Sequence, residues 1–185
     1  MKVYHSFISI LFALTATLFT LNSFSQANVQ WQWKNDYNVT FADIAYQNGF
    51  IYAVGQFTAP SVTLGATTLI NNGGTDLCVV KFDTSGNVIW ASGYGNASNE
   101  TITNLAVDNF GNIVFTGSFA NTLIIGGNTL ISAGGNDIFV VKLDGNGNVL
   151  FAKRAGGAAG SDFGKDICID NVGSIYVFAE SSGMT

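Results

Sequence analysis

The chain has few charged residues and almost no histidine, proline or cysteine. Charged side chains make up 10% of its 185 residues, and Pro60 and His5 are the only residues of their types. His5 lies in an apolar N-terminal stretch that we expect to be removed, which leaves a mature chain without histidine. Such a chain cannot build a Ser-His-Asp triad, a Cys-His pair or a His-ligated zinc site.

The first 25 residues have the pattern of a secretory signal peptide. Lys2 gives a positive start, an uncharged apolar run covers 7–21, and the small residues Ser23 and Ser25 precede the expected cleavage site. A run of about 15 residues is short for a membrane span, which needs about 20. We therefore expect residues 1–25 to be a signal peptide, with Ala27 as the other cleavage candidate. The mature chain is expected to be secreted or held at the cell surface, without a membrane span.

The mature chain is acidic. Without Lys2 it has six Lys and Arg residues against twelve Asp and Glu residues, a net charge of −6. Only Lys153 and Arg154 are adjacent basic residues. Nucleic acids and anionic lipids require clustered positive charge, so neither is an expected partner.

An internal repeat of about sixty residues organises the mature chain. The segments NVQW at 28–31, NVIW at 87–90 and NVLF at 148–151 align, which places Trp31, Trp90 and Phe151 in one column. A spacing of 61 residues also relates these pairs: Gly65 and Gly126, Asp76 and Asp137, Lys81 and Lys142, Gly86 and Gly147. After one inserted residue Gly49, Gly111 and Gly173 align as well. A fixed period of this kind predicts stacked supersecondary units.

Each copy is predicted to be a four-stranded antiparallel meander. In the second copy we expect strands at 103–107, 112–119, 138–144 and 149–154, with an extra hairpin at 123–132, because these runs are rich in Val, Ile, Phe and Thr. Short Asp-x-x-Gly turns at 83–87, 108–112, 144–148 and 170–174 would join neighbouring strands. After the signal peptide no segment has helical spacing of apolar residues.

Apolar residues at consecutive strand positions, as in the run 138–141, predict sheets that are covered on both faces. Repeated antiparallel sheets covered on both faces fit the blades of a β-propeller, so the predicted fold class is an all-β propeller with four-stranded antiparallel blades. A parallel β-helix and a sandwich of two similar halves are the alternatives. The tight hairpin turns argue against the β-helix.

The motifs also resemble a known bacterial repeat. The runs GGTDLCVVKFDTSGNVIWASGYG at 73–95 and LAVDNFGNIVFTGSF at 105–119 resemble the SBBP β-propeller repeat, and GGNDIFVVKLDGNGNVLFAKRAGG at 134–157 matches with Phe151 in place of Trp. The resemblance covers nearly all of residues 28–185. It implies an exported or surface protein of bacteria, and it assigns no catalytic residue, because the shared motif is structural.

The repeat divides residues 26–185 into a lone outer strand at 29–34, a first unit at about 41–92, a second at about 103–154 and a partial third at about 166–185. These amount to about two and a half blades, whereas a closed propeller needs roughly four. We therefore expect the sequence to be a fragment of a longer protein. The alternative is a ring that closes by oligomerisation.

The two cysteines have no metal-binding spacing. An exported pair could form a disulfide, but the repeat aligns Cys78 with Phe139 and Cys168 with Val107, which are different positions of the unit. Since both matched residues are bulky and apolar, we expect both cysteines to be buried, small apolar side chains.

Acidic residues are the only candidates for chemistry. The aspartates that recur in successive copies are expected to form turns: Asp76 and Asp137, Asp83 and Asp144, Asp108 and Asp170. DGNGN at 144–148 lacks the glycine and glutamate of a calcium loop, and AGSDFGKD at 159–166 is a connection between blades rather than a phosphate loop. We therefore expect no cofactor, no metal and no catalytic residue.

The predicted function is an exported, non-catalytic scaffold that binds a protein or glycan of unknown identity. One alternative is a carbohydrate-active enzyme, whose carboxylates would lie outside this sequence or among the acids that are specific to one copy: Asp36, Glu100, Asp162 and Glu180. The other alternative is a structural spacer in a larger surface protein.

Overall fold

The computed structural model describes residues 35–182, and within that range the chain forms strands, turns and loops but no helix. The signal peptide, Trp31 and the strand expected at 29–34 lie outside the described residues. The first sheet has the order β1 (Thr40–Gln47), β2 (Phe50–Phe57), β5 (Asp76–Asp83) and β6 (Val88–Tyr94). The second has the order β10 (Val149–Ala155), β9 (Asn128–Leu143), β8 (Ile113–Ile125) and β7 (Thr101–Val107). A pair, β11 (Asp162–Ile169) and β12 (Ile175–Ser181), follows.

All paired strands run antiparallel, and the only parallel contact among residues 35–182 is a single bridge between Thr75 and Asn99. The prediction of an all-β chain with antiparallel four-stranded sheets is therefore confirmed. The extra hairpin expected at 123–132 is present as an extension of β8 and β9. In the first copy the same hairpin is separate, as β3 (Ser61–Leu64) and β4 (Thr67–Ile70). No helix among the described residues is long and apolar enough to cross a membrane.

The copies repeat in fine detail as well as in strand order. The first strand of each unit has an irregular register at the same place: between Phe41 and Asp43 in β1, Ile102 and Asn104 in β7, and Gly164 and Asp166 in β11. On the outer strands Trp90 pairs with Lys81 and Phe151 pairs with Lys142. Trp90 and Phe151, which share one column of the sequence repeat, therefore occupy equivalent and similarly half-buried positions.

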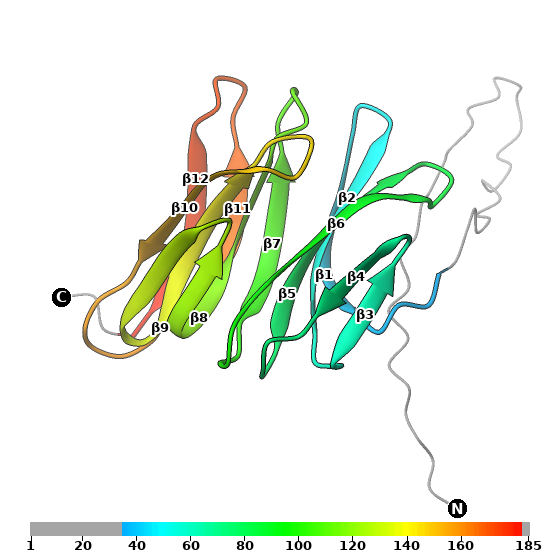
Figure 1. Ribbon diagram of the computed structural model, residues 1–185. Coiled ribbons are helices and arrows are strands. Elements are labelled where there is room, and N and C mark those ends of the chain that lie inside the picture. The colour runs from blue at the N-terminus through cyan, green and yellow to red at the C-terminus, as the bar shows by residue number, and fades with distance from the viewer. Residues whose placement is uncertain (1–34, 183–185) are drawn as a thin grey trace, which may run out of the picture.

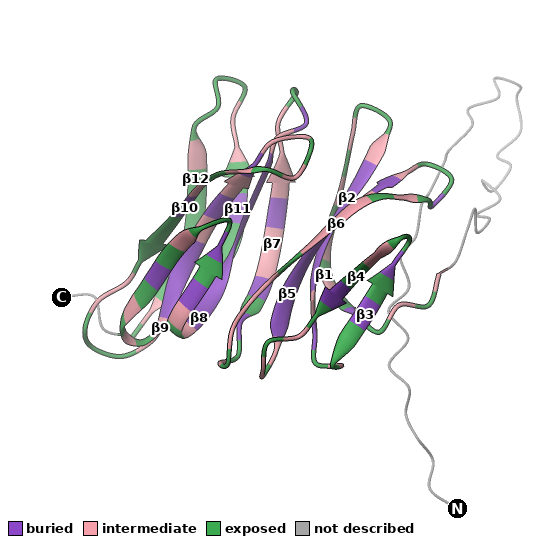
Figure 2. Cartoon of the chain, viewed as in Figure 1, coloured by how far each residue is buried: buried purple, intermediate pink, exposed green. Residues whose placement is uncertain are grey.

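The two large sheets pack face to face and share the main core (Figures 1 and 2). Tyr52 and Leu77 of the first sheet belong to the same buried cluster as Phe115 and Phe139 of the second. The central strands β2, β5 and β8 are buried over most of their length, as expected for sheets covered on both faces. Burial of the central strands therefore explains why their apolar residues do not alternate with polar ones.

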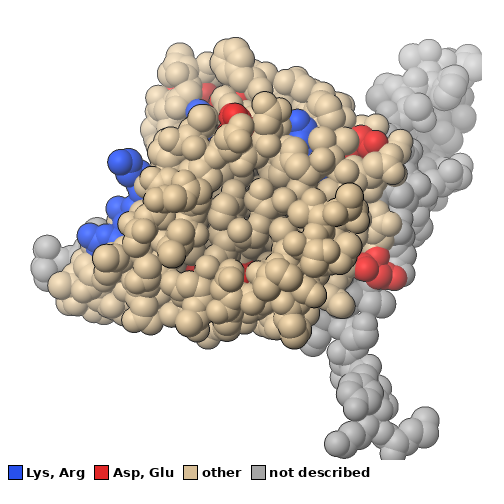
Figure 3. Space-filling view, in the orientation of Figure 1, with Lys and Arg blue, Asp and Glu red and all other residues tan. Residues whose placement is uncertain are grey.

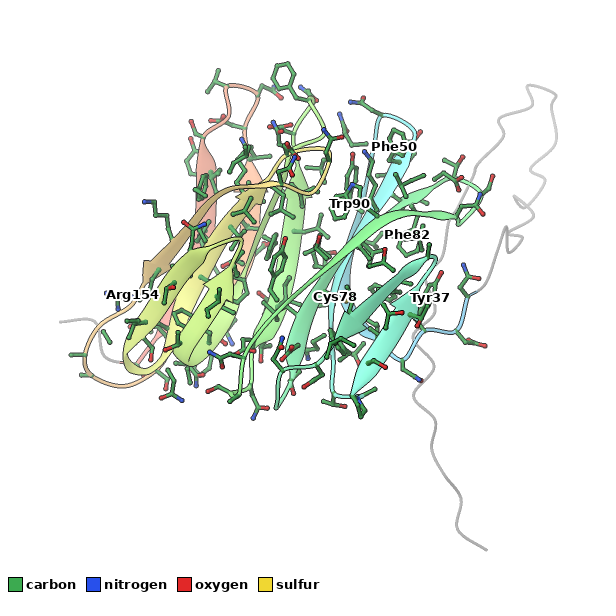
Figure 4. All side chains as sticks on the ribbon, in the orientation of Figure 1. Tyr37, Phe50, Cys78, Phe82, Trp90 and Arg154 are labelled. Carbon is green, nitrogen blue, oxygen red and sulfur yellow. The ribbon has the colours of Figure 1, made fainter. Side chains whose placement is uncertain are left out.

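A second core lies on the other face of the first sheet, beneath the β3–β4 hairpin. Phe82 is fully buried there, and its ring lies 6.2 Å from that of Tyr37 and 6.5 Å from that of Phe41, measured between centroids. Figure 4 shows Tyr37 and Phe82 together on this side of the sheet. In the first unit the β3–β4 hairpin thus covers the face of the sheet that points away from the second sheet.

The pair β11–β12 packs against the opposite face of the second sheet, with Gly164 close to the Thr116 side chain. Its other face is largely uncovered, because Tyr176 and Phe178 are 56% and 70% exposed. This corrects one prediction about the cysteines: both are free, but only Cys78 is buried, whereas Cys168 on β11 is exposed. Nothing among residues 35–182 packs on the Cys168 face, so its small side chain stays accessible.

Pairing also corrects the alignment of Cys168. Val107 pairs with Ile113 and Ile169 pairs with Ile175 at the ends of equivalent hairpins. Cys168 is therefore equivalent to Ala106 rather than to Val107. Cys78 pairs with Gly55 in the middle of the first sheet, as Phe139 pairs with Gly117 in the second. The two cysteines consequently remain at different positions of the unit.

Candidate functional site

Four five-residue turns with one internal design lie at the upper end of the sheets in Figure 1. In the turn 83–87 one oxygen of Asp83 accepts bonds from the Ser85 and Asn87 amides at 2.8 and 2.9 Å, and the other accepts one from the Asn87 side chain at 2.8 Å. The turns that start at Asp108 and Asp144 repeat this set of bonds, and Asp170 repeats its backbone part. The predicted turn-forming role of these four aspartates is confirmed.

The bonds within each turn stabilise the ionised carboxylate. The side-chain bond from Asn87 is the main reason why the pKa of Asp83 is lowered, and Asn148 has the same effect on the pKa of Asp144. Backbone donation from Ser174 lowers the pKa of Asp170. Because both oxygens of Asp144 accept bonds from within its own turn, DGNGN at 144–148 is a closed turn that holds itself.

A polar groove of about 360 Å³ lies between the turns 108–112 and 170–174. Asp108, Asn109, Asn112, Lys142, Asp170 and Asn171 give it hydrogen-bonding groups. Lys142 Nζ lies 3.4 Å from Asp108 Oδ2. The tips of the two turns add Phe110 and Val172, each 88% exposed. The groove therefore combines an ion pair that is largely buried at its base with exposed amide and apolar side chains at the tips of the turns.

The corresponding place between the first and second units is bridged by side chains. The first unit has a two-residue turn, Asn48–Gly49, in which both residues have positive φ. Asn48 Nδ2 donates to the Asn109 carbonyl at 2.9 Å, and Gln47 Nε2 donates to Asn109 Oδ1 at 3.2 Å. The groove between the second unit and β11–β12 thus differs from its counterpart, although the strands around the two places match.

The predicted role of the remaining repeated aspartates was wrong in part. Asp76 begins β5 and Asp137 lies within β9, both at the opposite end of the sheets from the four turns, and they are 1% and 0% exposed. Asp76 Oδ2 accepts bonds from the Asn72 amide and side chain at 2.9 and 3.0 Å. Asp137 Oδ2 accepts a bond from the Ala133 amide at 3.0 Å and one from Arg154. Each carboxylate accepts a bond from the backbone four residues earlier, as a turn residue would, but both side chains are buried in the interior.

Glu100 and Asp162 are not specific to one copy, which corrects the sequence interpretation. Each directly precedes or begins an innermost strand, each is fully buried, and each accepts a bond from the backbone of the preceding connection, at Asn96 and Gly157 respectively. They are 62 residues apart, because the connection at 156–161 is one residue longer than its counterpart. We call the place where Asp76 and Glu100 meet the first junction, and the equivalent place at Asp137 and Asp162 the second junction.

The surroundings shift the pKa values of the equivalent acids Glu100 and Asp162 in opposite directions. At the first junction the pKa of Glu100 is raised to about 8, mainly by burial and to a smaller extent by the nearby charge of Asp76. Burial also raises the pKa of Asp76. At the second junction a bond from the Ser181 side chain and one from the Gly157 amide lower the pKa of Asp162. Arg154, which Figure 4 labels on the edge strand β10, forms an ion pair with Asp137 Oδ2 through its Nη1.

No two of the four candidate acids form a catalytic pair. Glu100 and Asp162 are buried at different junctions, where no substrate can reach them. Glu180 is exposed and lies 2.9 Å from Lys165 Nζ. Asp36 is exposed before the first strand. Of AGSDFGKD at 159–166, residues 159–161 lie in the connection from β10 to β11, and 162–166 already belong to β11. The prediction of a link between units is therefore confirmed for the first three residues only.

Inter-unit contacts recur in the same form. Asp43 Oδ2 in β1 accepts a bond from the Leu105 amide in β7 at 2.9 Å, and the equivalent Asn104 Oδ1 accepts one from the Ile167 amide in β11 at 3.4 Å.

The surface that Figure 3 shows has few charged side chains between the two ends of the sheets. The residues 35–182 contain no cluster of three or more His, Cys, Asp or Glu side chains suited to a metal ion. No family model and no curated protein sequence matches the chain.

Proposed function

We propose that the chain is a non-catalytic binding scaffold of the β-propeller class, exported by its signal peptide and related to the SBBP repeat proteins. Three observations support the propeller. The two large sheets have one topology, each successive sheet packs on the far face of the one before, and the innermost strands contact each other through the same side-chain-to-amide bond. An arrangement that repeats one contact between successive sheets is typical of blades around an axis.

The observation that carries the binding role is the groove between the turns 108–112 and 170–174. Its walls are rigid, because each turn is closed by bonds to its own aspartate. By contrast, the side chains of Gln47 and Asn48 bridge the corresponding place between the first two units. Amide, carboxylate and ammonium groups can bond to hydroxyl groups, and the exposed Phe110 ring offers an apolar face. This combination suits a glycan better than a purely apolar ligand.

A glycan array followed by calorimetry with the best ligand tests the proposal. We expect Phe110→Ala to weaken binding tenfold or more. Asn146→Ala is the matched control, because Asn146 holds the same position as Phe110 in the turn 144–148 and lies outside the groove. Equal losses in both variants would argue against the groove.

The other candidate functions give different outcomes in the same assays. A structural spacer would show no saturable ligand on glycan or protein arrays. A carbohydrate-active enzyme would release sugar from the bound glycan. Export is tested separately, by N-terminal sequencing of the secreted protein, which should begin at Gln26 or at the residue after Ala27.

A further inference from the structure

Equivalent strands show which surface of a unit the following unit covers. Tyr52 and Val54 lie on the face of β2 that meets the second sheet, and both are buried in the shared core. The register of each hairpin places Tyr176 and Phe178 of β12 at the same two positions, where both are largely exposed. Together with Cys168 they line a hollow of about 210 Å³ on this pair of strands. We call this surface of β11 and β12 the rear face.

The first strands of the units show the complementary surface. Ile44 in β1, Leu105 in β7 and Ile167 in β11 hold one position of the unit. Leu105 and Ile167 are 5% and 4% exposed, because β7 packs on the first sheet and β11 on the second. Ile44 is 41% exposed, and Tyr46 on the same side of β1 is 66% exposed. This surface, the front face, points away from the second sheet, because Ile44 pairs with Ala53 of the second core.

A side-chain-to-amide bond accompanies each place where a rear face meets a front face. Asp43 and Asn104 accept these bonds from the amides of Leu105 and Ile167 in the following unit. Asp166 holds the equivalent position in β11 and is exposed. Its Oδ1 accepts a bond from the next amide of its own strand at 2.8 Å, as Asp43 Oδ1 does at 2.8 Å. Since Asp43 uses its Oδ2 for the bond to the following unit, Asp166 Oδ2 is in position to do the same.

We propose that the rear face of one chain binds the front face of a second copy, head to tail. Tyr176 and Phe178 would cover Ile44 and Tyr46 of the second copy, and Asp166 would accept a bond from its Ile44 amide. The match is with a copy of this chain because the chain carries both halves of a contact that it forms twice within residues 35–182. The two faces differ, so the contact is heterologous and leads to rings or to open filaments.

Sedimentation velocity of the mature protein at increasing concentration is the first test. We expect the sedimentation coefficient to rise with concentration. Ile44→Glu and Phe178→Glu each bury a charge in the contact and should weaken association at least tenfold. Ile89→Glu is the matched control, because Ile89 is an exposed isoleucine of the outer strand β6, and its equivalent Leu150 stays exposed although the second sheet has a neighbour on both faces. A mature protein that is monomeric at every concentration would overturn the proposal.

Mixing the two variants distinguishes a head-to-tail contact from a symmetric one. Ile44→Glu keeps its rear face and Phe178→Glu keeps its front face, so each alone should stay monomeric, whereas an equimolar mixture should form dimers and nothing larger. Dimers of Ile44→Glu alone would indicate a rear-to-rear contact, and equal association of all variants would indicate non-specific aggregation. Either result contradicts the proposal. Tyr46→Glu and Tyr176→Glu repeat the test at neighbouring positions, with melting temperature as the control for folding.

Discussion

The first and second junctions use the same backbone and the same pair of acid positions, yet they differ in how the negative charge is balanced. At the second junction Arg154, which lies opposite Phe139 on β10, pairs with Asp137. The equivalent residue on β6 is Gly93, opposite Cys78, and the printed bonds of Asp76 come from the amide groups of Asn72. The pKa of Glu100 is raised, but that of the equivalent Asp162 is lowered. The repeat thus fixes where the acids lie, and a single strand position determines whether an arginine accompanies them.

The largest expected effect comes from removing the arginine. Arg154→Met should lower the free energy of unfolding by about 3 kcal/mol, because it leaves the buried Asp137 carboxylate without its charged partner, and the partial exposure of Arg154 reduces the cost from the upper end of the range. Denaturant unfolding measures the change. Lys153→Met, on the neighbouring exposed residue of β10, is the matched control. An Arg154→Met protein as stable as the control would remove the contrast between the junctions.

A smaller effect should come from the glycines that contact the acids. A Cβ at Gly156 would lie 2.6 Å from the Asp137 carboxyl carbon, and one at Gly95 would lie 2.4 Å from that of Asp76. Gly127 also has positive φ, but a Cβ there would meet nothing within 4 Å. We expect Gly156→Ala to cost about 2 kcal/mol more than Gly127→Ala, since the former adds a clash to backbone strain. Thermal melts should show a similar additional cost for Gly95→Ala. If the costs of Gly95→Ala and Gly156→Ala differ clearly, the junctions differ in shape as well as in charge.

The pH dependence of stability should distinguish the two junctions. The pKa of Glu100 is about 8 in the folded protein, above its ordinary value of 4.5, and burial is the main cause. A raised pKa stabilises the fold fully below the unfolded value, and this contribution is lost as pH rises toward 8. Urea titrations from pH 5 to 8 should therefore show falling stability, and Glu100→Gln should flatten the profile. Asp162→Asn should not flatten it, because the pKa of Asp162 is lowered.

The smallest effect should come from the turns, where the copies do not differ. Asp83→Ala and Asp144→Ala remove the same set of bonds and should each lower the denaturation midpoint slightly and by the same amount, because each turn loses the side chain that closes it. Equal changes in the denaturation midpoint would restrict the difference between copies to the junctions. If one turn costs several times more than the other, the copies also differ at this end.

Much of the fold could be predicted from the sequence, because the signals are local. The Asp-x-x-Gly turns, the β-branched runs and the apolar stretch at 138–141 each indicate a strand or a hairpin within a few residues. The junctions could not be predicted in the same way. Glu100 and Asp162 differ in residue type, and the longer connection at 156–161 places them 62 residues apart. An alignment with a strict spacing of 61 residues therefore does not match them to each other. The sequence predicts turn residues at Asp76 and Asp137, because sequence alone does not show that their carboxylates are buried.

The exposure of Cys168 had a different cause. Its run is as apolar as a buried strand, but burial depends on what packs against that face, and none of residues 35–182 does. The same uncovered face includes Tyr176 and Phe178. Local sequence predicted the strand correctly, whereas its cover depends on residues distant in the chain.

The contact between Trp90 and the turn of the next unit has a consequence for how such a chain grows. Trp90 Nε1 and Lys81 Nζ both donate to the Gly145 carbonyl, at 3.2 and 2.9 Å, and the indole ring lies against Gly147. An earlier unit therefore recognises a later one through a bare stretch of main chain at its hairpin. Because the bonds go to a backbone carbonyl, any residue at the position of Gly145 can supply them. Gene duplication can therefore insert a further unit without redesigning this contact, provided that the new unit keeps the glycine equivalent to Gly147, where a side chain would meet the indole ring.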